Sequence, residues 1–428
     1  MNNKLDTSSI YYNESNAVLF EDDKNIEQKF KVSRKDLLLA YIDARKRKRN
    51  TRSHLVFEED LFRNIYHLWK ELVTDSYQIS ESNCFVVTRP KPREVFAASF
   101  RDRIVHHLII GKLMPYFEQK LIDNSFSCMS GKGTLYGVKK LQEAMRRHPN
   151  GKVYKNDISS FFMSISKSKL NTLLKEFIEL YHKGPIEERK YILALTEQII
   201  LHHPEENCNI HGDVLLWNLI DRNKSLFTVG KDRGLPIGNL TSQLFAGVYL
   251  MKLDKFLYEQ FGDDYGRYVD DFYIVSDDGE KVRKIIPQIE KLLYDDLDLI
   301  LHPNKRYSQP VRHGCKFLGY VVKGERIYVG NNTVNNFFQT IERYNTTNTI
   351  TVQDLVNCFR SLNSYLGYLS YCNAYKILRR LLFQLDRRWY PYFKTYTGKL
   401  SNKEIESCKK LKITVQYRSH YLLLNYLK

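Results

Sequence analysis

Hydrophobic positions along this 428-residue chain follow helical spacing in some segments and form short strand-like runs in others. Near-helical spacing predicts helices within 34–77 and at 101–116, and a broad apolar stripe that includes Leu244 and Val248 predicts a longer helix over 243–261. The remaining pattern predicts, in chain order, a hairpin at 84–97, a strand at 152–162, a helix at 167–201, a helix at 279–295, short strands at 315–329 and helices from about 333 onward. This alternation indicates a small sheet backed by helices and flanked by two further helical regions.

The run Gly-Arg-Tyr-Val-Asp-Asp-Phe at 266–272 places two adjacent carboxylates between aromatic-rich apolar stretches. Tyr268 and Phe272 favour strands, whereas Asp270 and Asp271 favour turns, so the run predicts a strand, a tight turn and a second strand. Neighbouring carboxylates repel each other and are usually neutralised by a cation; Mg²⁺ takes one or two protein carboxylates and leaves its other positions to water and phosphates. Taken alone, the run fits a solvated hairpin tip equally well.

A third carboxylate, Asp157, stands near the polar end of the strand predicted at 152–162. Phosphoryl transfer through two metal ions needs acids from separate elements, and Asp157 together with Asp270 meets that need. Between them, 234–243 reads Gly-Leu-Pro-Ile-Gly-Asn-Leu-Thr-Ser-Gln, a flexible turn leading into a helix, whose Ser and Gln can hydrogen-bond a sugar or a base. A capped helix start is the alternative interpretation of that segment.

The charge of the chain favours a polyanionic partner. The sequence has 66 Lys and Arg against 49 Asp and Glu, a formal charge of +17, together with 30 Tyr and 23 Phe that could stack on bases. Nucleic acid is the leading choice, and the dense basic run at 45–52 agrees with it, although a solvated helix end explains that run as well. The length allows two or three domains.

The composition also indicates the cellular compartment that we expect for the protein. Hydrophobic residues make up 43% of the chain, the first residues are polar, and no stretch is apolar enough to cross a bilayer, so we expect a cytoplasmic protein without a membrane partner. The seven Cys are scattered and fit reduced thiols. His202, His203, Cys208 and His211 could in principle hold zinc, but their spacing matches no standard zinc pattern and an ordinary loop is favoured.

Several motifs occur together in one order. They are 91–97 (Lys-Pro-Arg-Glu-Val-Phe-Ala), 100–107, 130–134 (Ser-Gly-Lys-Gly-Thr), Asp157 with Phe161 and Phe162, 234–243, 268–271 (Tyr-Val-Asp-Asp) and 314–320. Over about 35–385 this set resembles the reverse transcriptases, and the first three motifs resemble those of bacterial members.

The resemblance implies an α+β fold, a right-hand polymerase with fingers, a ferredoxin-like palm and a helical thumb. We expect an N-terminal extension at 1–33, fingers at 34–150, a palm at 151–330 and a basic helical thumb with a C-terminal extension at 331–428. A helical insertion belonging to the fingers is expected at about 167–233 of the palm.

The same resemblance implies roles for individual residues. Asp157, Asp270 and Asp271 match the catalytic, metal-binding aspartates, so two Mg²⁺ ions are expected, with Mn²⁺ as a substitute. Phe162 matches the aromatic residue that excludes a ribose 2′-hydroxyl, which implies a preference for dNTPs. The other implied dNTP-binding residues are Arg93, Lys132, Ile237 and Gln243.

Primer and template contacts are implied for a further set: Tyr268, Lys316, Phe317, Leu318 and Gly319. Phe317 and Leu318 could equally belong to the palm core, and a solvated basic surface is the alternative for Arg93 and Lys132.

The residue at position 237 indicates which group of reverse transcriptases the chain resembles. Many reverse transcriptases carry Gln at that position and end the motif with Ser-Pro, whereas this chain ends it with Ser242-Gln243. The combination resembles enzymes of diversity-generating retroelements and defence-associated reverse transcriptases. We therefore expect an RNA-directed DNA polymerase that copies a structured noncoding RNA from its own locus into DNA in antiphage defence. The alternatives are a mutagenic retroelement enzyme, an inactive RNA-binding scaffold and template-independent nucleotide addition.

Overall fold

The computed structural model describes residues 28–397, except 47, 49–50, 90, 378–379 and 381–383, together with 415–418 and 421–425. Most of the predicted extension at 1–33 and parts of the basic run at 45–52 lie outside the described residues. Helices and sheets are interleaved along the chain, which confirms the predicted α+β class. Among the residues placed by the structure, no helix has both the length and the apolar character needed to cross a bilayer.

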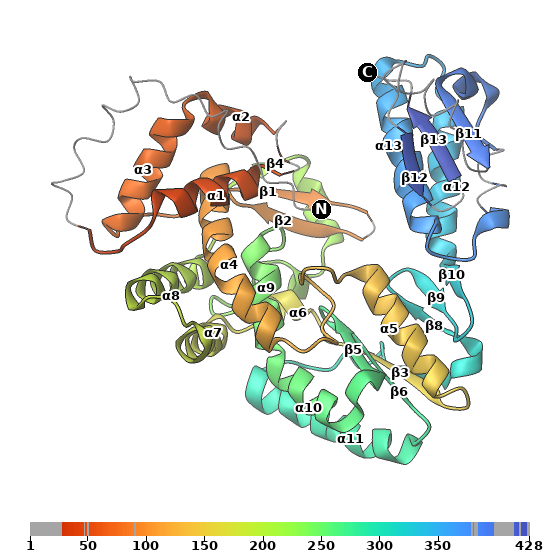
Figure 1. Ribbon diagram of the computed structural model, residues 1–428, viewed down its shortest axis with the longest axis horizontal. Helices are drawn as coiled ribbons and strands as arrows, with labels where there is room; N and C mark the ends of the chain where they lie inside the picture. The colour runs from red at the N-terminus through yellow and green to blue at the C-terminus, as the bar shows by residue number, and fades with distance from the viewer. Residues whose placement is uncertain are drawn as a thin grey trace.

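A four-stranded antiparallel sheet, called here the central sheet, lies in the lower part of the molecule, where Figure 1 labels three of its strands. Its strands are β5 (Tyr265–Tyr268), β6 (Asp271–Ser276), β3 (Lys152–Asp157) and β7 (Tyr307–Pro310), in that spatial order. In register, Val153 faces Val275 and Asp157 faces Asp271. The end of β3 and the start of β6, the two inner strands, therefore lie side by side at one end of the sheet, which we call its edge below.

Alternation along the strands assigns the two faces of this sheet to different helices. Tyr273 and Val275 share a core cluster with α5 (Thr134–Arg147). Phe272 and Ile274 pack in the main core with α10 (Met251–Phe261) and α11 (Gly279–Lys291). Burial of both faces leaves the ends of the strands as the part of the sheet where polar side chains can meet.

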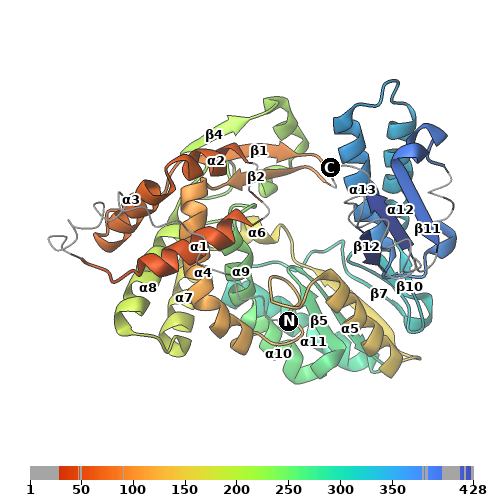
Figure 2. The ribbon, with the colours of Figure 1, turned by 45° about the horizontal axis from the view of Figure 1, so that its top comes forward.

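An N-terminal lobe lies above this sheet (Figure 2). It consists of α1 (Arg34–Arg45), α2 (Arg52–Glu59), α3 (Leu61–Val73), α4 (Phe100–Lys120) and a three-stranded sheet of β2 (Arg93–Ala97), β1 (Ser82–Val87) and β4 (Cys208–His211). The predicted helices within 34–77 and the hairpin at 84–97 are confirmed. β4 comes from the 203–233 segment and pairs with β1 in parallel, which the sequence pattern did not predict.

Two helices predicted as continuous are each divided. The helix expected at 167–201 is α7 (Lys167–Tyr181) and α8 (Ile186–Leu201), because Pro185 caps α8 and cannot continue α7. The helix expected at 243–261 is α9 (Leu240–Tyr249) and α10, with Leu250 outside helical geometry between them. The apolar stripe continues through the break, so periodicity alone could not locate it.

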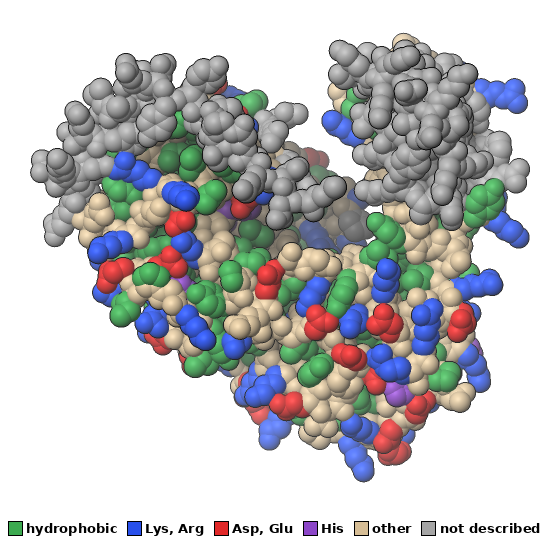
Figure 3. Space-filling view, viewed as in Figure 1, with side chains coloured by type: hydrophobic (Ala, Val, Ile, Leu, Met, Phe, Trp, Pro, Cys, Tyr) green, Lys and Arg blue, Asp and Glu red, His purple; other side chains and the backbone are tan. Residues whose placement is uncertain are grey.

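A C-terminal lobe stands opposite the N-terminal lobe, and the face between the two lobes is hollowed above the central sheet (Figure 3). A small sheet of β8 (Cys315–Phe317), β9 (Tyr320–Val322) and β10 (Ile327–Val329) leads into α12 (Asn331–Asn345) and α13 (Val352–Leu369).

The prediction that the chain is helical from about 333 onward is wrong for its last part. β11 (Phe393–Thr397), β13 (Tyr421–Asn425) and β12 (Val415–Arg418) form an antiparallel sheet. These segments contain Tyr and Thr, which fit a pleated sheet better than a helix.

Candidate active site

Of the adjacent aspartates, Asp270 lies on the two-residue turn between β5 and β6, and Asp271 is the first residue of β6. Tyr268 pairs with Asp271, which leaves Val269 and Asp270 as the turn residues. Val269 has a φ of 58°, a conformation that β-branched residues rarely adopt. The turn is therefore strained and needs support from its surroundings.

Arg267 supplies that support. Its guanidinium is fully buried; it donates to the Val269 carbonyl at 2.7 Å and, through Nε, to Asp254 Oδ1 at 2.7 Å. The hydroxyl of Tyr265 donates to the same Asp254 oxygen at 2.6 Å. This paired and hydrogen-bonded charge holds the strained turn in a single geometry.

Asp157 reaches the turn from the neighbouring strand. It lies opposite Asp271, and its own carbonyl accepts from the His302 amide at 2.8 Å, so the end of β3 is fastened to the segment before β7. The structure thus brings the three predicted aspartates to one edge of the sheet, although 113 residues separate Asp157 from Asp270 in the sequence.

The three acids influence one another. Burial and the nearby negative charge of Asp157 raise the pKa of Asp270 to about 6. Burial also raises the pKa of Asp271, while the ammonium of Lys155, 2.7 Å away, opposes the shift. Lys305 donates to Asp157 Oδ2. The site therefore concentrates negative charge that two lysines compensate only in part.

The donor set fits a hard divalent cation. Asp271 Oδ1 is buried without a hydrogen-bond partner, and the side chains of Asp157 and Asp271 are only 15% and 23% exposed. Within the described ranges, no group of three or more His, Cys, Asp or Glu is already arranged as a metal cage. Mg²⁺ does not need one, because it takes one or two carboxylates and fills its remaining positions with water and phosphate oxygens.

Phe162 and Ile237 share one environment. Both pack against a small apolar cluster of Cys84, Phe96 and Met163 with Leu226. The Phe96 amide donates to the Ile237 carbonyl at 2.9 Å, and the Leu235 amide donates to the Phe162 carbonyl at 2.8 Å. The structure therefore joins the 234–243 segment to both β2 and the segment that follows Asp157.

Comparison with known families agrees with this geometry. Residues 89–322, more than half of the chain and including the three aspartates, match the family described as reverse transcriptase (RNA-dependent DNA polymerase). The chain belongs to the reverse transcriptase family. RNA-directed DNA polymerase, the enzyme class predicted from the sequence, is the class of this family. No curated protein matches the chain.

The solved structures similar to this reverse transcriptase include telomerases from two yeasts. A Candida albicans telomerase in complex with a TWJ fragment of telomeric RNA has a TM-score of 0.41 and 11% identity, over 72% of this chain and 57% of the telomerase chain. Apo telomerase from Candida tropicalis has a TM-score of 0.41 and 10% identity, over 72% and 56%. The chain thus spans less than two-thirds of the length of these telomerase chains.

The other residues predicted to contact dNTPs lie in different environments. Arg93 begins β2 and is exposed, and Gln243 in α9 is exposed and accepts from the Cys128 thiol at 3.2 Å. Lys132 instead pairs with Asp123, with Nζ 3.1 Å from Oδ1, and its side chain is only 14% exposed. This contact favours a structural role for Lys132. Of the two cations predicted to bind dNTPs, Arg93 is therefore the accessible one.

The residues predicted to contact primer or template divide between surface and core. Leu318 and Gly319 form a tight turn between β8 and β9, with φ values of 50° and 87°. Lys316 is exposed, whereas Phe317 is buried with its ring 5.3 Å from that of Tyr273, which supports the palm-core alternative for Phe317. Tyr268 is partly buried against the same core cluster.

The zinc alternative finds no support in the described residues. The His202 carbonyl accepts from Lys167 at 2.7 Å, His203 pairs with Glu205 at 2.9 Å, and His211 contacts Asn83 at 2.7 Å. The three histidines therefore make other polar contacts, and none of the four candidate ligands belongs to a metal-binding group among the described residues.

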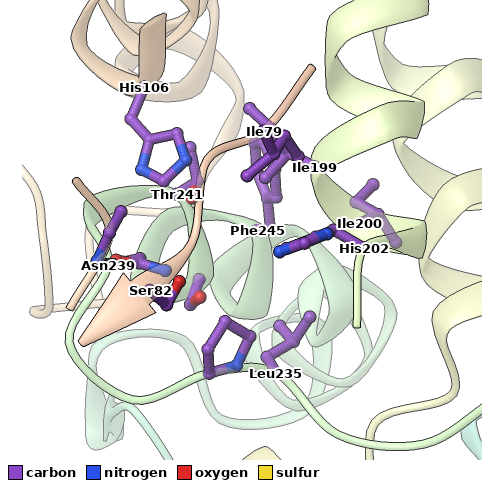
Figure 4. A pocket seen from close by; sticks show the side chains of 13 residues that line it. Ile79, Ser82, His106, Ile199, Ile200, His202, Leu235, Asn239, Thr241 and Phe245 are labelled. Carbon is purple, nitrogen blue, oxygen red and sulfur yellow. Dashed lines mark hydrogen bonds between the residues drawn. The ribbon is translucent and has the colours of Figure 1, made fainter. Parts of the chain in front are cut away.

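His202 lines a pocket next to the start of α9 (Figure 4). His106 and Thr241 also line it, and burial lowers the pKa of His106 to about 3. Both imidazoles favour the neutral form, because burial lowers the pKa of His202 as well. The pocket adjoins the 234–243 segment on the side of α8.

Sequence reasoning missed three residues of the site: Lys155, Arg267 and Lys305. Strand alternation places Lys155 on the same face as Asp157, and that signal could have found it. Arg267 falls within the 266–272 run, but nothing in the sequence distinguishes it from the many other basic residues of the chain. Lys305 lies 148 residues from its partner, and no local pattern connects the two.

Proposed function

We propose that this chain is an active RNA-directed DNA polymerase that extends a primer with dNTPs. The observation that carries the proposal is the convergence of Asp157, Asp270 and Asp271, with a buried, unpartnered carboxylate oxygen, at the edge of the sheet beside Phe162. Such a partly desolvated acidic site suits metal-assisted phosphoryl transfer better than a structural role.

In this reaction the primer 3′-hydroxyl oxygen attacks the α-phosphorus of the dNTP. The new O–P bond forms as the bond to pyrophosphate breaks, and the hydroxyl proton is released. Two Mg²⁺ ions, or Mn²⁺ in their place, would supply Lewis-acid stabilisation when bound. Asp157 and Asp270 would hold them, with Asp271 as the third carboxylate. The ring of Phe162 would exclude a ribose 2′-hydroxyl, and the exposed Arg93 would bind the triphosphate.

The proposed template is a structured noncoding RNA from the protein's own locus, and the proposed role is antiphage defence in the cytoplasm. The departure at Ile237 fits both the defence-associated and the retroelement enzymes, and the free cysteines among the described residues suit a reducing compartment. A mutagenic retroelement enzyme is the second candidate, because the same departure occurs there. Sequencing of RNA and cDNA that copurify with the protein separates the two: a repeat template with mutated cDNA supports the retroelement, and one structured RNA supports defence.

Primer extension on a plain RNA template tests the polymerase activity. The variant Asp270→Asn keeps the shape of the side chain but removes a ligand charge, so we expect incorporation to fall by about a thousandfold or more with RNA binding retained. The exposed Asp295 offers a matched control, and Asp295→Asn is expected to behave as wild type.

Retained synthesis in Asp270→Asn would overturn the site assignment. A wild-type protein that binds RNA but incorporates no dNTP with Mg²⁺ or Mn²⁺ would favour the inactive scaffold instead. Incorporation that continues without any template would favour template-independent addition.

A further inference from the structure

Lys155 lies on β3 two residues before Asp157, on the same face of the central sheet. Its ammonium is 2.7 Å from Asp271 Oδ2, and the two side chains are only 20% and 23% exposed. Its opposite neighbours are Tyr273 on β6 and Tyr307 on β7. Lys155 therefore occupies a confined position within the sheet rather than a free place on the surface.

The packing on the far side of Lys155 restricts it further. The ammonium lies 5.8 Å from the centre of the Phe317 ring, and Phe317 is itself buried against Tyr273. A cation over an aromatic face gains electrostatic stabilisation in addition to its ion pair. These contacts keep the ammonium close to Asp271.

The second lysine of the site provides a contrast. Lys305 pairs with Asp157, but its side chain is 53% exposed, so it can move into solvent at little cost when a cation approaches. Lys155 is only 20% exposed and has less freedom, since moving away would leave two partly buried charges unpaired. When a cation binds, the Lys305–Asp157 pair can therefore separate more easily than the Lys155–Asp271 pair.

Asp271 has one oxygen held and one oxygen free. Oδ2 meets Lys155, and Oδ1 is buried with no hydrogen-bond partner. A cation fixed at one oxygen of a carboxylate restricts its rotation, so the second oxygen favours one direction.

We propose that Lys155 is a positioning residue that fixes Asp271 so that its Oδ1 points to the metal position of the polymerase site. The inference rests on the proposed function. It makes Asp271 a carboxylate that offers a single oxygen, oriented by a lysine that stays in place throughout the reaction.

Mn²⁺ binding to the purified full-length chain, measured by calorimetry without nucleic acid, tests this role. In Lys155→Met, loss of orientation is expected to weaken Mn²⁺ binding by about tenfold, a typical effect of removing a group that orients a metal ligand. If Lys155 merely neutralised charge, its removal would tighten Mn²⁺ binding, because a cation near the site would be gone. The two roles therefore predict opposite signs.

Lys152 is the matched control. It lies on the same strand and is exposed, so Lys152→Met is expected to bind Mn²⁺ as wild type. Lys155→Arg keeps the charge with a different geometry and is expected to recover part of the affinity; it also replaces the Met variant if that one fails to fold. Steady-state kinetics of Lys155→Met should show a lower kcat at saturating Mg²⁺, with the KM for dNTP changed much less.

Unchanged or tighter Mn²⁺ binding in Lys155→Met would overturn the inference. The binding measurement needs no template, primer or dNTP. An absence of DNA synthesis by wild type would therefore overturn the proposed polymerase activity, and the Mn²⁺ comparison would still decide the role of Lys155.

Discussion

At the scale of single residues, Ile237 is the predicted dNTP-binding residue that departs from the commoner Gln. Its side chain is partly buried against the cluster that contains Phe96 and Met163, and it carries no group that can donate or accept a hydrogen bond. If Ile237 contacts the incoming nucleotide as predicted, discrimination there depends on shape, which rejects a wrong substrate less strongly than a hydrogen bond does.

We predict that Ile237→Gln lowers the error rate of copying. One added hydrogen bond of about 1 kcal/mol corresponds to roughly a fivefold change in discrimination. Sequencing of cDNA made by both proteins measures it, and Ile237→Val, which adds no hydrogen bond, should copy with the wild-type error rate. Equal error rates in wild type and Ile237→Gln would contradict the prediction that residue 237 affects copying fidelity.

At the scale of elements, the site depends on how the 234–243 segment meets β2. The Phe96 amide bonds to the Ile237 carbonyl, and Gly238 follows with a φ of 124°. A Cβ at Gly238 would lie 2.8 Å from Val95 Cγ1 and 3.0 Å from the Phe96 carbonyl oxygen. Only glycine lets the two segments approach this closely without strain.

Gly238→Ala is therefore expected to destabilise the protein by about 1–3 kcal/mol and to raise the KM for dNTP. Thermal unfolding and primer extension measure the two effects. Gly230 lies in the same loop, and a Cβ added there would meet no atom within 4 Å, so Gly230→Ala serves as the control and should change neither quantity. A Gly238→Ala protein as stable as the control would contradict this account of the contact.

At the scale of the whole molecule, contacts between distant segments hold the central sheet together at the end of its strands that is away from the site. His148, after α5, bridges Asp264 at 2.7 Å and Asp277 at 2.5 Å, which precede β5 and follow β6. Burial alone would lower the pKa of His148, but its hydrogen bonds to Asp277 and Asp264 outweigh burial and raise it.

This bridge predicts a pH-dependent contribution to stability. Because the folded pKa lies above the unfolded value, the contribution is present in full below the unfolded pKa and is lost as the pH rises through the folded pKa. We expect His148→Gln to lower the free energy of unfolding by about 1 kcal/mol at pH 6 and by less at pH 9, in denaturant titrations. The exposed His67 supplies the control His67→Gln, and a pH-independent difference for His148→Gln would contradict the bridge.

The positions of most helices and strands follow from local patterns, because their apolar spacing is a local property. The break between α7 and α8 at Pro185 was also readable in principle. The break at Leu250 was not, since the apolar stripe runs through it. The C-terminal strands were not predicted, because the residues from 333 onward are basic and aromatic and lack the alternation that marks a strand.

The sequence by itself determined which residues are the candidates for the chemistry of the site. Asp157 at a strand end, Asp270 and Asp271 at a turn, Phe162 and the 234–243 segment are all recognisable from residue type and order. Only the tertiary structure decided which cation each acid meets. Lys155 pairs with Asp271 and Lys305 with Asp157, through contacts between strands and across 148 residues of chain, and such pairings depend on register and packing that no local pattern encodes.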